Sequence, residues 1–311
     1  MSVIPGCNTL LLGNGCGVSL KFPMPHRLST GACNRPNFST ILRCNEQNRG
    51  RIGIARRRAT KEGKDLRTAL WIMEGVYVIW LFVLPFAPGD PVWAISAQTI
   101  DSLIGLSLNF FFILPLLNSV GVDSLNSPVL HPASEGLFNF VIGWTLLFAP
   151  LLYTDRRRDR YKGSLDLLWG AQMFLTNAFL IPYMAIRLGE SEGGKSSSKL
   201  GKLMTKGAGV VGWVGAGVCV VSVLWVLFGR GESGFGEWRE RWEYLVGYVG
   251  SERLAYAFVW DICIYSVFQP WLIADNLQNV HKTKIDLVRT VRFVPVFGAL
   301  AYLLCLDLTQ E

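Results

Sequence analysis

The placement of Lys and Arg along the chain constrains its fold more than any other feature. Seven apolar stretches have no Lys or Arg in their interior, and each is long enough to cross a hydrocarbon core of ~30 Å at 1.5 Å per residue. A basic side chain at the bilayer centre costs roughly 2.5–3.5 kcal/mol on insertion scales. The sequence therefore predicts an all-α, polytopic transmembrane helix bundle of about seven helices. The predicted spans are 68–88, 97–117, 136–153, 165–186, 208–228, 254–274 and 290–306.

Composition agrees with a membrane protein and argues against a nucleic-acid partner. Charged residues make up only 17% of the chain and hydrophobic residues 50%, whereas soluble proteins carry about 25% charged residues. The formal net charge is +7, but residues 1–44 hold four cations and no acid, so the rest of the chain has a net charge of only +3. We therefore expect membrane lipids, and no nucleic acid, as partners.

Residues 1–44 have the composition of an organelle transit peptide. They contain scattered Ser and Thr, lack Asp and Glu, and have no apolar run long enough for a secretory signal. The stretch Leu42-Arg43-Cys44 resembles the cleavage site of chloroplast precursors, which predicts a mature start near Asn45. A mitochondrial leader and a cytosolic tail stay open as alternatives. The predicted location is a chloroplast membrane, either the thylakoid or the inner envelope.

Loop charges predict the orientation of the spans. With seven spans, the basic stromal segment 45–67 shares one side with loops 187–207 and 275–292, and this side carries 17 Lys and Arg against 9 on the other. The positive-inside rule then places the amino terminus in the stroma and the carboxy terminus on the opposite side. The basic loop 154–163 falls on the cation-poor side, which conflicts with the rule.

The bundle, residues 68–311, contains two hydrophilic connections and a possible internal duplication. Loop 188–207 is typical of a flexible polar linker, and loop 230–253 has the Trp, Arg and Glu pattern of an interfacial helix. Two spans share an Asp-x-x-x-Gly start, a later Asn and a final Pro, which indicates either duplication or similar apolar composition. These residues are Asp101, Gly105, Asn109 and Pro115 in one span and Asp166, Gly170, Asn177 and Pro182 in the other.

Ionisable residues inside the spans are the strongest functional candidates, because they are costly in a bilayer and usually face a polar interior. Asp261 and Glu74 lie well inside their spans and are the candidate catalytic residues. With no cation inside any span, we expect Asp261 to hold a proton and to face a polar partner from Asn109, Asn139, Asn177 or Glu74. The alternative is a packing role through hydrogen bonds worth only about 0.6 kcal/mol on average. The candidate substrate- or lipid-facing residues are Asp101, Asn109, Asn177, Tyr265 and Gln269.

The basic loop 155–162 is a candidate interaction site for an acidic membrane-protein partner or an anionic lipid. No metal or cofactor site is predicted, because the chain after the leader has only His131 and His281 and no metal-binding or nucleophile motif. The interaction residues in the basic loop are Arg156, Arg157, Arg158 and Arg160.

One part of the sequence resembles a known family. Within 254–304, the stretches Val259-Trp260-Asp261-Ile262, 274–279 and Val294-Pro295-Val296-Phe297-Gly298 resemble the plastid multi-span membrane family linked to neoxanthin formation. The resemblance covers about a sixth of the chain. It implies a helix bundle in a plastid membrane and a role in carotenoid metabolism.

Two hypotheses for the function follow. The first is a protein, either a binding protein or an enzyme, that handles a carotenoid or other isoprenoid lipid, with Glu74 and Asp261 facing an apolar cavity. The second is a non-catalytic assembly factor or small-solute transporter. A cavity lined by both acids would favour the first hypothesis, and acids hydrogen-bonded between packed helices would favour the second. The sequence does not decide whether the chain is an enzyme.

Overall fold

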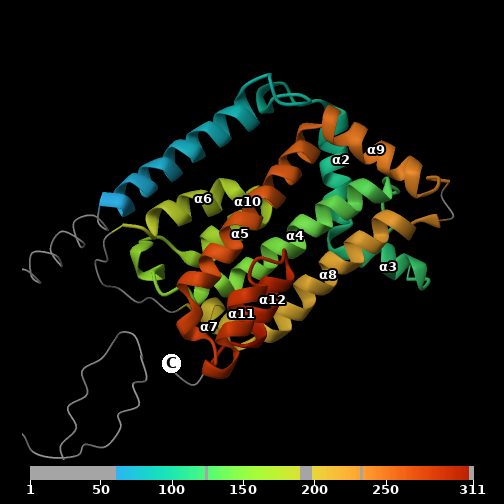
Figure 1. The fold of residues 1–311 in the computed structure, drawn as a ribbon. Helices are drawn as coiled ribbons and strands as arrows, with labels where there is room; N and C mark the ends of the chain where they lie inside the picture. The colour runs from blue at the N-terminus through green and yellow to red at the C-terminus, as the bar shows by residue number, and fades with distance from the viewer. Residues whose placement is uncertain (1–60, 123–124, 190–197, 232–233, 308–311) are drawn as a thin grey trace, which may run out of the picture. The chain divides into compact units, whose positions relative to one another are not determined.

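The computed structural model describes residues 61–122, 125–189, 198–231 and 234–307. The predicted transit peptide and most of segment 45–67 lie outside this part of the chain. The regular secondary structure of the described residues is helical (Figure 1), with one isolated β-bridge between Val280 and Leu306, which confirms the all-α prediction. By length and composition alone, five helical stretches could cross a membrane, namely Lys61–Val83, Ala97–Ser119, Pro132–Tyr153, Ala208–Phe228 and Arg253–Asp275. The second of them is interrupted at Phe111 and Phe112.

Several helices after the first helix, Lys61–Val83, begin at a capping side chain. The hydroxyls of Ser96, Ser164 and Ser198 each accept a backbone N–H from the following turn. The helices are α2 (Ala97–Leu108), α3 (Ile113–Ser119), α4 (Pro132–Tyr153), α5 (Leu165–Leu175), α6 (Asn177–Ile186), α7 (Lys199–Lys206), α8 (Ala208–Phe228), α9 (Trp238–Ser251), α10 (Arg253–Asp275), α11 (Ile285–Val291) and α12 (Phe297–Leu304).

Three of the seven predicted spans are broken helices. Phe111 and Phe112, between α2 and α3, have φ of 55° and 57°. Thr176, between α5 and α6, has φ of 40°, and Val296, just before α12, has φ of 64°. Side chains other than Gly rarely adopt such angles, and a residue in this conformation interrupts the helical hydrogen-bond ladder. The prediction of seven continuous spans is therefore not confirmed.

The α5–α6 pair enters the bundle and returns to the end at which it began. The Tyr153 hydroxyl, at the end of α4, donates to Asp166 at the start of α5 over 2.7 Å. After α6, Arg187 pairs with Asp155, just beyond α4, and with Asp275, the last residue of α10. Both ends of this hairpin therefore lie beside the end of α4. We call the end of the bundle where Asp155, Arg187 and Asp275 meet the cationic end.

The α11–α12 pair returns to the cationic end in the same way. Val280, just beyond α10, forms the β-bridge with Leu306, which follows α12. Between these points, the backbone N–H of Val296 donates to the side chain of Gln269 inside α10. The segment 285–304 is therefore a second hairpin that is inserted from the cationic end.

The first helix also starts at the cationic end. Near its beginning, the Arg67 guanidinium lies against Gly189, which follows α6. The start of the first helix and Leu306 therefore share one end of the bundle. This arrangement of the described residues differs from the prediction that the two chain ends lie on opposite sides, because the segments 165–186 and 290–306 turn back within the bundle.

Connections at the opposite end join the other helix termini. Arg253, at the start of α10, donates to the carbonyls of Leu84 and Gly89 beyond the first helix. Thr99 of α2 donates to Glu252, and the loop after α3 contacts Arg230 beyond α8. α2 and α3 therefore begin and end at this opposite end, together with α9. Four long helices, the first helix, α4, α8 and α10, connect the two ends (Figure 1).

This arrangement removes the charge conflict of the basic loop. Sixteen of the twenty Lys and Arg in the described chain lie on segments that meet at or enter from the cationic end, and four lie at the opposite end. The loop 154–163 now falls on the cation-rich side. A bundle with four crossing helices therefore satisfies the positive-inside rule better than one with seven.

α4 is the central helix of the bundle, and nearly all of its side chains are buried. α8 packs closely along it because Gly143 and Gly215 face each other, each with an ideal Cβ position about 3 Å from the carbonyl oxygen of the other. On another part of α8, Gly212 lies against Leu300 and Leu303 of α12. The small residues of α8 therefore serve packing within one chain.

Candidate functional site

Asp261 lies between three elements of the bundle and is only 2% exposed. Its Oδ1 accepts hydrogen bonds from the Tyr77 hydroxyl of the first helix over 3.1 Å and from the Asn177 amide of α6 over 2.7 Å. The Thr176 hydroxyl lies beside the same carboxyl group. The expectation that Asp261 faces a polar partner inside the bundle is confirmed, and of the four expected partners it is Asn177 that donates to it. We call Tyr77, Thr176, Asn177 and Asp261 the hairpin-tip cluster.

The broken backbone of the α5–α6 hairpin positions this cluster. Asp261 is eight residues from the start of α10 and fourteen from its end, so at 1.5 Å per residue it lies roughly 12 Å and 21 Å from the two ends of that helix. The turn at Thr176 therefore lies deep in the bundle. Asn177 is completely buried, and its carbonyl Oδ1 has no hydrogen-bond partner among the described residues. An unpaired buried acceptor costs about 1–3 kcal/mol of folding free energy and indicates a site that can accept a further hydrogen bond.

The polar stripe of α10 continues from Asp261 toward the cationic end. The Tyr265 hydroxyl shares a 2.7 Å hydrogen bond with Thr145 of α4. One turn further, Gln269 accepts from the Trp144 indole. The Gln269 amide also donates to two carbonyls at the tip of the α11–α12 hairpin, those of Arg292 and Val294. α10 therefore holds the tips of both hairpins that enter from the cationic end, one at Asp261 and one at Gln269.

Glu74, Asp101 and Asn109 make no hydrogen bond to this cluster among the described residues. Glu74 lies on the first helix one turn before Tyr77, and its Oε2 is buried without a hydrogen-bond partner among the described residues. Asp101 is exposed on α2. Asn109 is fully buried but lies near the opposite end, where its amide donates to Glu135. Of the seven acid and polar candidates, only Asn177, Tyr265 and Gln269 join Asp261 in one polar region.

Sequence reasoning missed a buried ion pair at the cationic end. Arg187 and Asp155 have side chains that are 0% exposed and make two hydrogen bonds, of 2.7 and 2.9 Å. Tyr183 and Asn276 also donate to Asp155. Burial opposes ionisation of this acid, but the hydrogen bonds and charge of Arg187 hold the pKa of Asp155 below its ordinary range. The network ties α4, α6 and α10 together where the first hairpin begins and ends.

A second buried carboxylate was also missed, near the opposite end. Glu135, in the first turn of α4, is 0% exposed and accepts from Arg230 over 2.7 and 2.8 Å. The Trp225 indole and the Asn109 amide donate to the same carboxylate. Neither pair could be recognised from the sequence, because all four residues lie at the boundaries of predicted spans. Charged residues at such boundaries are ordinarily loop or interfacial residues.

The predicted interaction loop is partly engaged within the chain. Arg156 contacts Asn276 and Gln278, Arg157 lies 3.7 Å from Asp275, and Arg160 donates to the carbonyl of Arg187. Arg158 donates to the carbonyl of Tyr153. These contacts fasten the loop to the ends of α4, α6 and α10. Binding of an acidic protein or anionic lipid by this loop remains a proposal.

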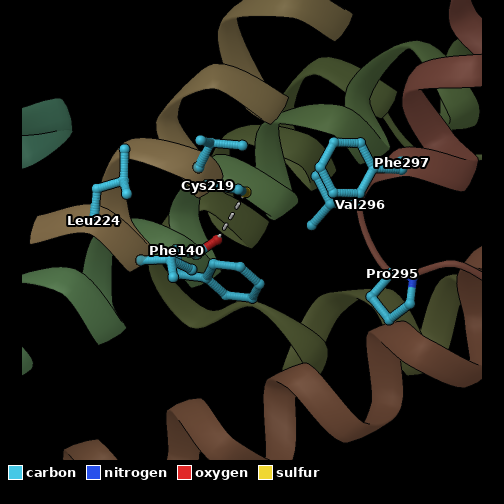
Figure 2. A pocket seen from close by; sticks show the side chains of 8 residues that line it. Phe140, Cys219, Leu224, Pro295, Val296 and Phe297 are labelled. Atoms are coloured by element: carbon cyan, nitrogen blue, oxygen red, sulfur yellow. Dashed lines mark hydrogen bonds between the residues drawn. The ribbon is translucent and has the colours of Figure 1, made fainter. Parts of the chain in front are cut away.

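Two apolar grooves flank the hairpin tips. The first, with a volume of about 290 Å³, lies between the first helix and α10 and is lined by Met73, Val76, Tyr77, Trp80, Leu81, Tyr256, Trp260 and Ile264. The second has a volume of about 300 Å³. Figure 2 shows this second groove between Phe140 and Cys219 on one side and Pro295 to Phe297, at the α11–α12 tip, on the other. Neither Asp261 nor Glu74 lines these two grooves.

Among the described residues, no group of three or more His, Cys, Asp or Glu side chains is placed to hold a metal ion. Comparison with known proteins finds no matching protein family, curated protein or solved structure.

Proposed function

We propose that the protein is a multi-pass plastid membrane protein that moves a small solute through the bilayer at the hairpin-tip cluster. The observation that carries this proposal is the contact between the broken backbone at Thr176 and Asn177 and the buried carboxyl of Asp261. Broken helices that meet a buried ionisable residue within the bilayer form substrate and ion sites in transporters. Such a site can change shape, because the broken segment is not held by a continuous helical ladder.

The surroundings of the acids support transport more than chemistry on a bound lipid. Asp261 is hydrogen-bonded between the first helix, α6 and its own helix, and the two apolar grooves are lined by neither candidate acid. An acid hydrogen-bonded between packed helices, as Asp261 is, is the arrangement expected of the non-catalytic hypothesis.

The experiment is an uptake assay with Asn177→Leu. Purified protein is reconstituted in lipid vesicles, the vesicles are incubated with a small-molecule extract of chloroplast stroma, and their contents are identified by mass spectrometry. We expect at least one compound to accumulate above protein-free vesicles. We expect Asn177→Leu to reduce that uptake at least tenfold, because it removes the amide at the hairpin tip. Asn118→Leu, in which the lost amide lies near the end of α3, is the matched control and should retain uptake.

Two results of this assay would contradict the transport proposal. One is that no compound accumulates above protein-free vesicles. The other is that Asn177→Leu and Asn118→Leu take up the same amount as the unmodified protein while both keep its thermal stability.

A second candidate function is binding of a carotenoid or other isoprenoid lipid, and the groove between the first helix and α10 favours it. Its lining is almost entirely apolar, and the Tyr77 hydroxyl connects its wall to Asp261. Its volume is at the small end of ligand sites, which suits one ring or one chain segment of such a lipid. The resemblance of residues 254–304 to a carotenoid-linked family points the same way. An isoprenoid that stays bound through purification, in vesicles that take up no solute, would favour this candidate.

A further inference from the structure

The chain contains two units of similar construction that run in opposite directions. In each unit a long helix is followed by a broken helix, and the break has an asparagine beside it. The first unit is the first helix with α2 and α3, and its asparagine is Asn109. The second is α4 with α5 and α6, and its asparagine is Asn177. The first unit's broken helix begins and ends at the opposite end, and the second unit's at the cationic end, which is the geometry of an inverted-topology repeat.

The two asparagines make equivalent contacts. Each is fully buried, and each donates its amide N–H to a buried carboxylate, Asn109 to Glu135 over 2.5 Å and Asn177 to Asp261 over 2.7 Å. In both residues the carbonyl Oδ1 has no partner among the described residues. The shared sequence pattern thus corresponds to a shared pair, an asparagine at a helix break with a carboxylate from a neighbouring helix.

The two pairs differ in what neutralises the carboxylate. Glu135 is bound by the guanidinium of Arg230, which makes it a fixed ion pair. Among the described residues, the groups that donate hydrogen bonds to Asp261 are the neutral Tyr77 and Asn177, with Thr176 beside it. The guanidinium of Arg253, eight residues before Asp261 on α10, is committed to backbone carbonyls.

Within the described part of the chain, no charged group takes the place of Arg230 at Asp261. The titratable groups that face Asp261 are the phenols of Tyr77 and Tyr265. Glu74 lies one turn from Tyr77 on the first helix, and the α5–α6 hairpin and α4 contribute the uncharged side chains of Gln172, Thr176, Asn177 and Thr145.

A bound proton would neutralise Asp261, as Arg230 neutralises Glu135. A carboxylic acid and a primary amide form a cyclic pair, in which the amide N–H donates to one carboxyl oxygen and the acid O–H donates to the amide carbonyl. The first of these bonds is present between Asn177 and Asp261, and the free Oδ1 of Asn177 is the acceptor that the second requires. In a cyclic pair of this kind, protonation of the carboxylate adds the second bond, and deprotonation removes it.

We propose that Asp261 and Asn177 form an exchangeable proton-binding site, whereas the corresponding pair, Asn109 of the first unit and Glu135 of α4, is fixed by Arg230. This inference deepens the transport proposal and rests on it only for the coupling of the proton to a solute. The proton site itself depends on the contacts of Asp261 and not on transport.

Infrared difference spectroscopy on the full chain in lipid, recorded between high and low pH, tests the proposal. We expect a carbonyl stretching band of a protonated, buried carboxyl group that disappears in Asp261→Asn. Asn177→Ala should shift this band, because the acid then loses its amide partner. Asp286→Asn, which changes a side chain that is 93% exposed, is the matched control and should leave the band in place.

A band that persists in Asp261→Asn would overturn the proposal. If that variant does not fold, Tyr77→Phe is the deciding variant, because it removes the hydroxyl that donates to Asp261. The band should shift if Asp261 carries the proton. An unchanged band would mean that another acid carries it. The transport proposal fails separately. If the infrared band is present but no solute is taken up, the proton site is supported and the transport proposal is contradicted. If solute is taken up but the band is absent, the proton site is contradicted and the transport proposal is not.

Discussion

Replacing Arg187 with Met is expected to lower the free energy of unfolding by about 3–5 kcal/mol, because it leaves Asp155 buried without its charge partner. Met keeps the apolar bulk of the side chain, so the loss reports the ion pair and its hydrogen bonds and not a cavity. Tyr183 and Asn276 remain as donors, but neither carries a charge. Reversible unfolding of the purified protein in detergent, followed by its tryptophan fluorescence, measures the difference.

Arg289→Met is the matched control for Arg187→Met. Arg289 pairs with Asp286 on α11, where both side chains are more than half exposed, and such pairs contribute about 0–1 kcal/mol. A loss of stability in Arg187→Met no larger than that in Arg289→Met would show that the buried network does not hold the bundle together.

The same pair gives the protein a pH dependence with a defined sign. The pKa of Asp155 lies below its ordinary range in the folded state, so the unfolded chain binds this proton more readily. The stabilisation is complete above the ordinary pKa of Asp and is lost as the pH falls through the lower, folded pKa. In Arg187→Met the loss of stability at low pH should be smaller, because the charge that lowers the pKa of Asp155 has been removed.

Glu135→Gln is expected to lower the free energy of unfolding by about 3–5 kcal/mol, because it leaves the Arg230 guanidinium beside an uncharged amide, without its charge partner. Arg230→Gln should have a similar effect because it strands the carboxylate. The double variant should lose much less than the sum of the two, since neither charge is then unpaired. A double-mutant cycle on detergent-solubilised protein measures this coupling. Losses that simply add would show that Glu135 and Arg230 act independently.

Hydropathy and charge predict the long helices well. The boundaries of α8 match the predicted span 208–228, and α10 differs from the span 254–274 by one residue at each end. These helices have continuous apolar sequence between charged or Gly-rich ends, so the cost of burying charge in a bilayer fixes their limits. The same reasoning places Asp261 inside the bundle, because an acid in a span avoids lipid.

The hairpins could not be predicted in the same way. The stretch 165–186 is apolar throughout, and hydropathy records its length but not the reversal at Thr176. Neither Thr176 nor Val296 is a Gly, so their positive φ angles have no signal in residue type. One signal was present. The basic loop 154–163 violated the positive-inside rule under seven spans, and that conflict pointed to a segment that does not cross.

The missed ion pairs have a related cause. Asp155 and Arg187 lie just outside two predicted spans and look like ordinary loop charges until the α5–α6 hairpin brings them together. Only an arrangement in which 165–186 turns back places the two residues at the same end of the bundle.

The most direct test of this account is the side of the membrane from which single cysteines react with a membrane-impermeant maleimide, in a chain whose native cysteines are replaced by alanine. Lys162→Cys, Lys199→Cys and Lys282→Cys report the cationic end, and Asp90→Cys and Arg239→Cys report the opposite end, all at exposed positions. We expect the first three to react from one side of the membrane and the last two from the other. Reaction of Lys162→Cys from the same side as Asp90→Cys and Arg239→Cys would mean that 165–186 crosses the membrane, and would contradict the hairpin on which the site depends.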